Sequence, residues 1–193
     1  MKKLIMIIFF VISVFVKAQL FVGLRDTKYV YGGYLFECGM NTCLEHSVYS
    51  DKFAFQKVRL NIGYTHKWNN INMRIKTYMS TLWNGAYQDY GLQVGADYFM
   101  IDWWGISGTV NTHYDSGLRY ETCYLIGTTF NVNEHISFLA NYTTIPEYRK
   151  SEKRIRGGVA FKVGGLKVIP EISIPIKEQI NTIRLLCSME YVF

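Results

Sequence analysis

Apolar and polar residues alternate along almost the whole chain beyond its first 18 residues. From Lys57 to Thr65, basic and small polar residues occupy every second position, and Val58, Leu60 and Ile62 stand between them. Successive side chains of a β-strand point to opposite faces, so a repeat of two residues predicts strands with one apolar and one polar face. The 3.6-residue repeat of an amphipathic helix is hard to find in the same region. The alternation therefore predicts an all-β fold.

The alternating segments predict the number of strands. Eleven of them are separated by turn or loop residues, and they cover residues 28–38, 42–50, 53–67, 71–83, 87–100, 103–113, 119–131, 135–145, 153–163, 166–176 and 181–193. A barrel whose two chain ends lie on the same side of a membrane needs an even number of strands. A short first strand at Leu20–Arg25 completes twelve. Ten is the alternative, if one early segment lies outside the wall.

Two kinds of all-β protein share this pattern but turn the apolar face in opposite directions. A soluble sandwich or barrel buries it, whereas a transmembrane barrel turns it toward lipid and lines the lumen with polar residues. Most expected strands have about 11–15 residues, more than the roughly 5–6 usual in soluble sheets and enough to cross a bilayer at a tilt. Tight turns also alternate with longer polar links, as in outer-membrane barrels. We therefore expect an antiparallel up-and-down transmembrane β-barrel.

The first 18 residues have the layout of a secretory signal peptide. Lys2 and Lys3 precede an apolar run from Leu4 to Val16, and small residues lead to an expected cleavage site after Ala18. The run is shorter than the roughly 20 residues that a membrane-spanning helix needs. Cleavage would leave residues 19–193 as the barrel domain and remove three lysines, so the formal net charge would fall from +6 to +3. The smaller charge argues against a nucleic-acid-binding protein.

The C-terminal residues Met189-Glu190-Tyr191-Val192-Phe193 resemble the targeting signal of outer-membrane β-barrel proteins. In that signal, alternating apolar and aromatic residues lead to a C-terminal Phe, so Tyr191 and Phe193 are the predicted assembly residues. The resemblance is to the porin-like outer-membrane β-barrel superfamily, and it identifies no subfamily. It implies insertion into the outer membrane of a Gram-negative cell by the barrel assembly machinery. The aromatic fraction of 16% fits this location, because Tyr and Trp gather at membrane interfaces.

The charged residues fall on the polar face of the alternation. This face must be the lumen, because an Arg or Lys that faces lipid costs about 2–4 kcal/mol near the midplane. The predicted lumen-lining residues are Lys57, Arg59, Arg74, Lys76, Asp89, Asp97, Arg119, Glu121, Arg154, Arg156, Lys162, Lys167, Glu171, Arg184 and Glu190. One interpretation is a closed interior of paired charges, since side chains can fill a small barrel. The other is a narrow pore that favours anions, because a basic lining attracts them.

The function follows from the choice between these two interiors. The main expectation is a structural or accessory component of a larger outer-membrane protein complex, surrounded by outer-membrane lipid and closed in its lumen. The alternative is a narrow channel for small anionic solutes. The sequence contains no motif for binding a cofactor or a nucleic acid. We therefore expect neither a cofactor nor a nucleic-acid partner.

A third hypothesis is an enzyme at the rim of the barrel that modifies lipid or peptide. In the segment Thr112–Gly117, His113 and Asp115 share a strand face, so the carboxylate could orient the imidazole and Ser116 could act as a nucleophile. Asp-Ser-Gly is also ordinary turn chemistry. The residues of Glu45-His46-Ser47 alternate between faces, which makes this second group a weaker candidate. We therefore assign no catalytic residue.

The four cysteines suggest one possible bond and no metal site. Cys38 and Cys43 flank an expected tight hairpin, where a disulfide could form in an oxidising compartment. Cys123 is expected to face inward and Cys187 outward, so these two should not bond. The sequence has no Cys-x-x-Cys or Cys/His spacing typical of zinc sites, and no metal ligand is predicted.

Overall fold

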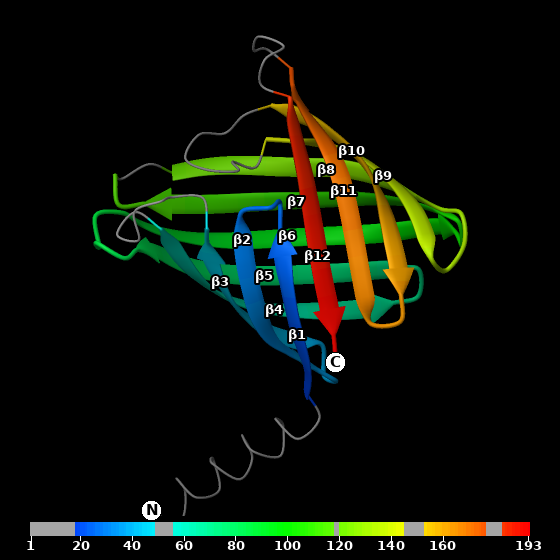
Figure 1. Cartoon of the computed structure of the whole chain (residues 1–193), viewed down its shortest axis with the longest axis horizontal. Coiled ribbons are helices and arrows are strands. Elements are labelled where there is room, and N and C mark those ends of the chain that lie inside the picture. The colour runs from blue at the N-terminus through cyan, green and yellow to red at the C-terminus, as the bar shows by residue number, and fades with distance from the viewer. Residues whose placement is uncertain (1–17, 49–55, 118–119, 145–152, 177–182) are drawn as a thin grey trace, which may run out of the picture.

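The structure, a computed structural model, describes residues 18–48, 56–117, 120–144, 153–176 and 183–193. These residues form twelve antiparallel strands that close into one barrel, in which each strand pairs with its sequence neighbours and β1 pairs with β12 (Figure 1). The strands are β1 (Ala18–Arg25), β2 (Tyr29–Phe36), β3 (Met40–Ser47), β4 (Lys57–Trp68), β5 (Ile71–Leu82), β6 (Gln88–Ile101), β7 (Trp104–Asp115), β8 (Tyr120–Asn131), β9 (Ile136–Thr143), β10 (Arg154–Val163), β11 (Leu166–Pro175) and β12 (Arg184–Val192). The predicted up-and-down barrel of twelve strands is confirmed, and the alternative of ten is wrong.

The two ends of the barrel have different connections. At one end, which we call the turn end, β4 joins β5 through Asn69 and Asn70, and β10 joins β11 through Gly164 and Gly165. Asn69 and Gly164 have φ angles of 51° and 58°, and Asn and Gly tolerate this left-handed backbone best. The opposite end, the loop end, carries the longer connections that follow β3, β5, β7, β9 and β11. The observed β3 ends three residues before its predicted limit, at Ser47.

The wall is apolar outside and polar inside. Outward-facing side chains such as Val94, Val110 and Ile126 are exposed, whereas inward-facing Asn61 and Arg154 are almost completely buried. This is the reverse of a soluble barrel, and lipid is the solvent that such an outer surface requires. In the described part of the chain, no helix is both long and apolar enough to cross a membrane.

Two inward-facing glycines make room for tyrosines from neighbouring strands. A Cβ added at Gly91 would lie 2.2 Å from Cζ of Tyr78, its partner across β5 and β6. Gly23 has the same relation to Tyr31 across β1 and β2, with a distance of 2.4 Å. Each tyrosine ring therefore lies directly over a backbone that carries no side chain. The arrangement lets large polar rings fill the interior without pushing the strands apart.

The seam between β1 and β12 closes the barrel. Its register runs from Phe21 opposite Val192 to Leu24 opposite Met189. Beyond it, the amide of Phe193 donates to the carbonyl of Leu20 at 2.9 Å. The rings of Tyr191 and Phe193 meet edge to face with centroids 4.7 Å apart. Of the predicted signal peptide, residues 1–17 lie outside the described residues, and Ala18 begins β1.

Candidate functional site: the charged lumen

The structure places the described members of the predicted lumen set on the buried side of their strands. In β4, for example, Lys57 and Arg59 share a side with the buried Asn61, and in β5 Lys76 shares a side with the buried Tyr78. Arg119 lies outside the described residues. The others that occupy such positions are Arg74, Asp89, Asp97, Glu121, Arg154, Arg156, Lys162, Lys167, Glu171, Arg184 and Glu190. What these side chains bind stays a prediction.

The most deeply buried charge cluster centres on Asp89 near the loop end. Its Oδ2 lies 3.0 Å from Nζ of Lys57 and 3.6 Å from the Arg59 guanidinium. The hydroxyl of Ser80 also donates to this oxygen at 3.3 Å. The Arg59 guanidinium stacks over the ring of Tyr78, 4.4 Å from its centroid. Two cations and a hydroxyl thus surround Oδ2 and offset part of the cost of removing the carboxylate from water, whereas Oδ1 has no hydrogen-bond partner among the described residues.

A second cluster contains Arg25, Asp26 and Glu45, which are not among the predicted lumen-lining residues. Arg25 pairs with the buried Glu45 at 2.8 Å, and Asp26 pairs with Arg156 at 3.3 Å. The alternation could have identified two of them, because Arg25 is on the same side of β1 as Gly23, and Glu45 is on the same side of β3 as Ser47. No strand pattern could have identified Asp26, because it lies in the connection after β1 with a left-handed φ of 55°.

The Arg154 guanidinium is anchored to a serine on the neighbouring strand β11. Its Nε donates to Oγ of Ser173 at 2.7 Å, and its terminal nitrogen donates to the Ser173 carbonyl at 3.0 Å. The side chain is almost completely buried. This bidentate contact fixes the guanidinium against β11 and makes it part of the packed wall.

The turn half of the lumen is less densely paired. Arg74 contacts Asp97 at 2.7 Å, with side chains 46% and 24% exposed. Lys76 has no carboxylate within 4.0 Å among the described residues. Beside it lies a hollow of about 160 Å³ whose polar lining includes Asn41, Gln93 and Thr109. The described lumen therefore contains at least one space that is bordered by two cations, Arg74 and Lys76, and by neutral polar groups.

Lysines also gather on β10 and β11 near the turn end. Lys162 lies directly opposite Lys167, and neither has a carboxylate within 4.0 Å in the part of the chain that the structure describes. On the neighbouring β12, Glu190 accepts a hydrogen bond from the Tyr31 hydroxyl at 3.0 Å. Like charges opposite one another destabilise a sheet, and Glu190, which lies directly opposite Lys167 on β12, faces the pair from the other side.

The segment Thr112–Gly117 does not assemble a catalytic triad. The Asp115 carboxylate accepts the amide of Gly117 at 2.9 Å, and the Ser116 hydroxyl accepts the amide of Gln88 at 3.2 Å. Both side chains therefore accept backbone amides in or beside the turn, which is the ordinary chemistry of Asp-Ser-Gly. His113 instead faces Glu121 on β8, with Nε2 and Oε2 3.6 Å apart.

The cysteines are all free thiols. The disulfide considered between Cys38 and Cys43 is not formed: Cys38 is exposed in the turn between β2 and β3, and Cys43 lies on β3, opposite the buried Asn61. His46 lies on the outer side of β3 and accepts a hydrogen bond from the Trp83 indole at 3.0 Å. Glu45 and Ser47 therefore lie on the inner face of the wall, and His46 lies on the outer face.

Comparison with known proteins relates the chain to others by fold alone. No protein-family model matches the sequence, and a search of curated proteins finds no match. The barrel is similar to the KdgM porin in complex with disordered oligogalacturonate, with a TM-score of 0.68, 9% identity, and coverage of 91% of this chain and 98% of that one. It is also similar to the NanC porin (TM-score 0.56, 10% identity, coverage 91% and 97%) and to Omp33 of Acinetobacter baumannii (TM-score 0.54, 9% identity, coverage 91% and 96%). The chain thus has the fold of outer-membrane porins.

Proposed function

We propose that this protein is a narrow outer-membrane channel for small anionic solutes. The sequence alone favours a structural or accessory role over a channel, but the similarity to porins favours the channel. The KdgM porin is described in complex with oligogalacturonate, an acidic sugar oligomer. By analogy, acidic sugars are the solute class to test first on this chain.

The observation that carries the proposal is the polar hollow beside Lys76. The inward-facing cations Lys57 and Arg59 at the loop end are matched by a carboxylate in the cluster around Asp89. Lys76 faces Asn41, Gln93 and Thr109 around the hollow instead. A cation among neutral hydrogen-bonding groups offers an anion both charge and polar contacts to replace its hydration shell.

Lys162 and Lys167 extend this preference toward the turn end. Their ammonium groups repel one another across β10 and β11, and a passing anion would relieve that repulsion. Basic residues also outnumber acidic ones on the inward positions of the described strands. A lumen of this sign concentrates anions and excludes cations.

The proposal includes how the protein reaches the membrane. The signal peptide predicted over residues 1–18 would direct the chain across the inner membrane of a Gram-negative cell. The barrel assembly machinery would then recognise Tyr191 and Phe193 and insert the barrel into outer-membrane lipid. The outward-facing apolar residues of the wall support that destination.

Single-channel recording in planar bilayers tests the channel. The purified barrel should give discrete conductance steps, and its reversal potential in a salt gradient should show a preference for chloride over potassium. Addition of oligogalacturonate should reduce the current if acidic sugars enter the lumen. A purified, folded barrel that gives no conductance would contradict the channel, and a stoichiometric partner in gentle native purification would then favour the accessory role.

A further inference from the structure

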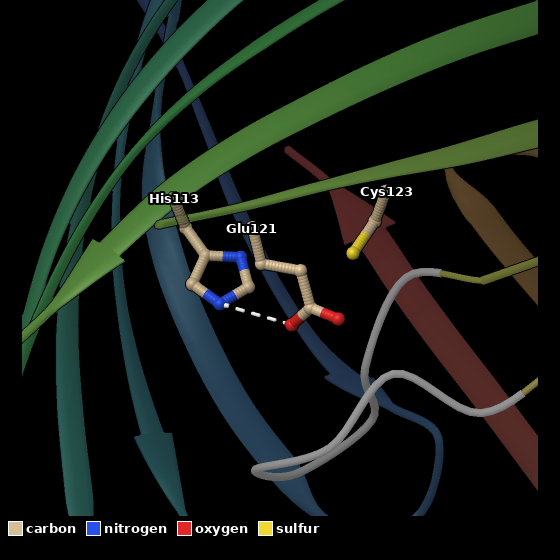
Figure 2. Close-up of side chains that lie close together, drawn as sticks. All are labelled: His113, Glu121 and Cys123. Atoms are coloured by element: carbon tan, nitrogen blue, oxygen red, sulfur yellow. Dashed lines mark ion pairs between the residues drawn. The ribbon is translucent and has the colours of Figure 1, made fainter. Parts of the chain in front are cut away.

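Three side chains with metal-binding atoms meet inside the barrel near the loop end. Figure 2 shows His113 from β7 beside Glu121 and Cys123 from β8, with a dashed line between His113 and Glu121. The register explains the meeting, because His113 lies directly opposite Glu121. Cys123 is two residues further along β8 and therefore points to the same side. Sequence spacing could not predict this group, since two of its members are joined only by the pairing of β7 with β8.

The geometry of this group suits a metal ion. One ring nitrogen of His113, one carboxylate oxygen of Glu121 and the sulfur of Cys123 lie within 4.8 Å of one another. Tetrahedral zinc has bonds of about 2.0–2.3 Å, which place its ligands roughly 3.3–3.8 Å apart. Small rotations of the side chains would therefore bring all three atoms to one ion. Three protein ligands leave a fourth position for water or a solute.

The imidazole of His113 supplies a second, independent observation. Its side chain is only 8% exposed, and its Nδ1 is buried with no hydrogen-bond partner among the described residues. A buried nitrogen without a partner costs roughly 1–3 kcal/mol and calls for a specific explanation. A metal ion bound at Nδ1 would give this nitrogen a partner, whereas the ion pair with Glu121 involves the other ring nitrogen.

We propose that His113, Glu121 and Cys123 bind one divalent transition-metal ion of the zinc type inside the lumen. Imidazole and thiolate are ligands that Zn²⁺ prefers, whereas Mg²⁺ and Ca²⁺ take oxygen ligands. Binding replaces the thiol proton of Cys123 with a metal–sulfur bond and releases that proton to solvent. The Glu121 side chain is 34% exposed, so an ion can reach the group from the lumen. This site is separate from the proposed channel function and does not depend on it.

Cobalt is the best probe, because Co²⁺ substitutes for Zn²⁺ and reports its ligands by absorbance. The folded full-length barrel, reduced and stripped with a chelator, is titrated with Co²⁺ in detergent. The proposal expects saturation at one ion per barrel and a thiolate-to-cobalt charge-transfer band. Zn²⁺ should displace the Co²⁺ and remove the band.

Variants distinguish this site from nonspecific metal binding elsewhere on the protein. Cys123→Ser should abolish the charge-transfer band, and His113→Gln or Glu121→Gln should weaken Co²⁺ binding by at least about tenfold to a hundredfold, the loss caused by changing residues that only support metal ligands. Cys187→Ser and Cys43→Ser, which change thiols outside the group, should keep both the band and the affinity. Heat-modifiable migration in gels confirms that each variant is folded. A folded wild-type barrel without saturable binding, or a band that survives Cys123→Ser, would overturn the site.

Discussion

Asp89 and Lys57 form an ion pair of 3.0 Å between β6 and β4, and their side chains are only 6% and 8% exposed. The two strands are not neighbours, since β5 lies between them and contributes Ser80 to the same carboxylate. The pair therefore ties three strands together across the lumen side of the wall. Its burial gives it more weight than the surface ion pairs that contribute little to stability.

Replacement of this carboxylate should destabilise the barrel. Asp89→Asn leaves Lys57 and Arg59 close together without a counter-charge, and loss of one partner from a buried pair costs about 3–5 kcal/mol. Urea unfolding in lipid vesicles, followed by tryptophan fluorescence, measures the change. Asp97→Asn is the matched control, because its partner Arg74 is 46% exposed and such pairs are worth about 1 kcal/mol or less. Equal losses for both variants would contradict the special role of the buried pair.

The contact between Tyr78 and Gly91 predicts a steric effect. Gly91→Ala places a methyl group 2.2 Å from the tyrosine ring, and overpacking of this kind costs about 1–3 kcal/mol. Gly108→Ala is the control, because a Cβ there meets nothing within 4 Å. The same urea titration should show that the alanine at 91 costs far less in a Tyr78→Ala background. A penalty that is unchanged in that background would mean that the ring is not its cause.

The charge of Lys76 should set part of the anion preference. Lys76→Gln removes a cation beside the polar hollow, so the reversal potential should move toward that of an unselective pore. Lys76→Arg keeps the charge and serves as the control, with a reversal potential close to that of the wild type. Equal reversal potentials for the two variants would mean that the charge of Lys76 does not set the anion preference.

Phe193 should matter more for assembly than for stability. Its deletion removes one hydrogen bond to Leu20, worth about 1 kcal/mol, and the edge-to-face contact with Tyr191. We expect a much larger fall in the fraction of heat-modifiable, folded barrel in membranes, because the predicted assembly signal is lost. Phe138→Ala, which truncates an exposed aromatic residue on β9, should assemble normally. Normal insertion without Phe193 would count against the signal.

The fold could be predicted from the sequence because the polarity repeat of a strand is local. The alternation within each segment shows which of its residues face inward. The number of strands and the inward position of residues such as Lys57 can therefore be predicted without knowing which strands pair. Strand ends are harder to predict, because residues where the wall meets the loops are exposed on both faces and no longer alternate in polarity. The observed β9 ends at Thr143, two residues before its predicted limit.

Partners across the lumen could not be predicted, because they depend on register. Arg25 meets Glu45 only because β1, β2 and β3 pair in one alignment. The same holds for His113 and Glu121. Proximity in sequence also does not decide bonding: Cys38 and Cys43 are close in sequence, but one lies in an exposed turn and the other on a strand, and both are free.

The joint between β1 and β12 governs how the wall can form. The two strands are separated by all the others, so the ring cannot close until its last member has been made. Before closure, both edges present amide and carbonyl groups that lipid cannot satisfy. Joining segments so distant in sequence also costs loop entropy. Partial versions of this wall should therefore not persist in a membrane, and closure should be all-or-none.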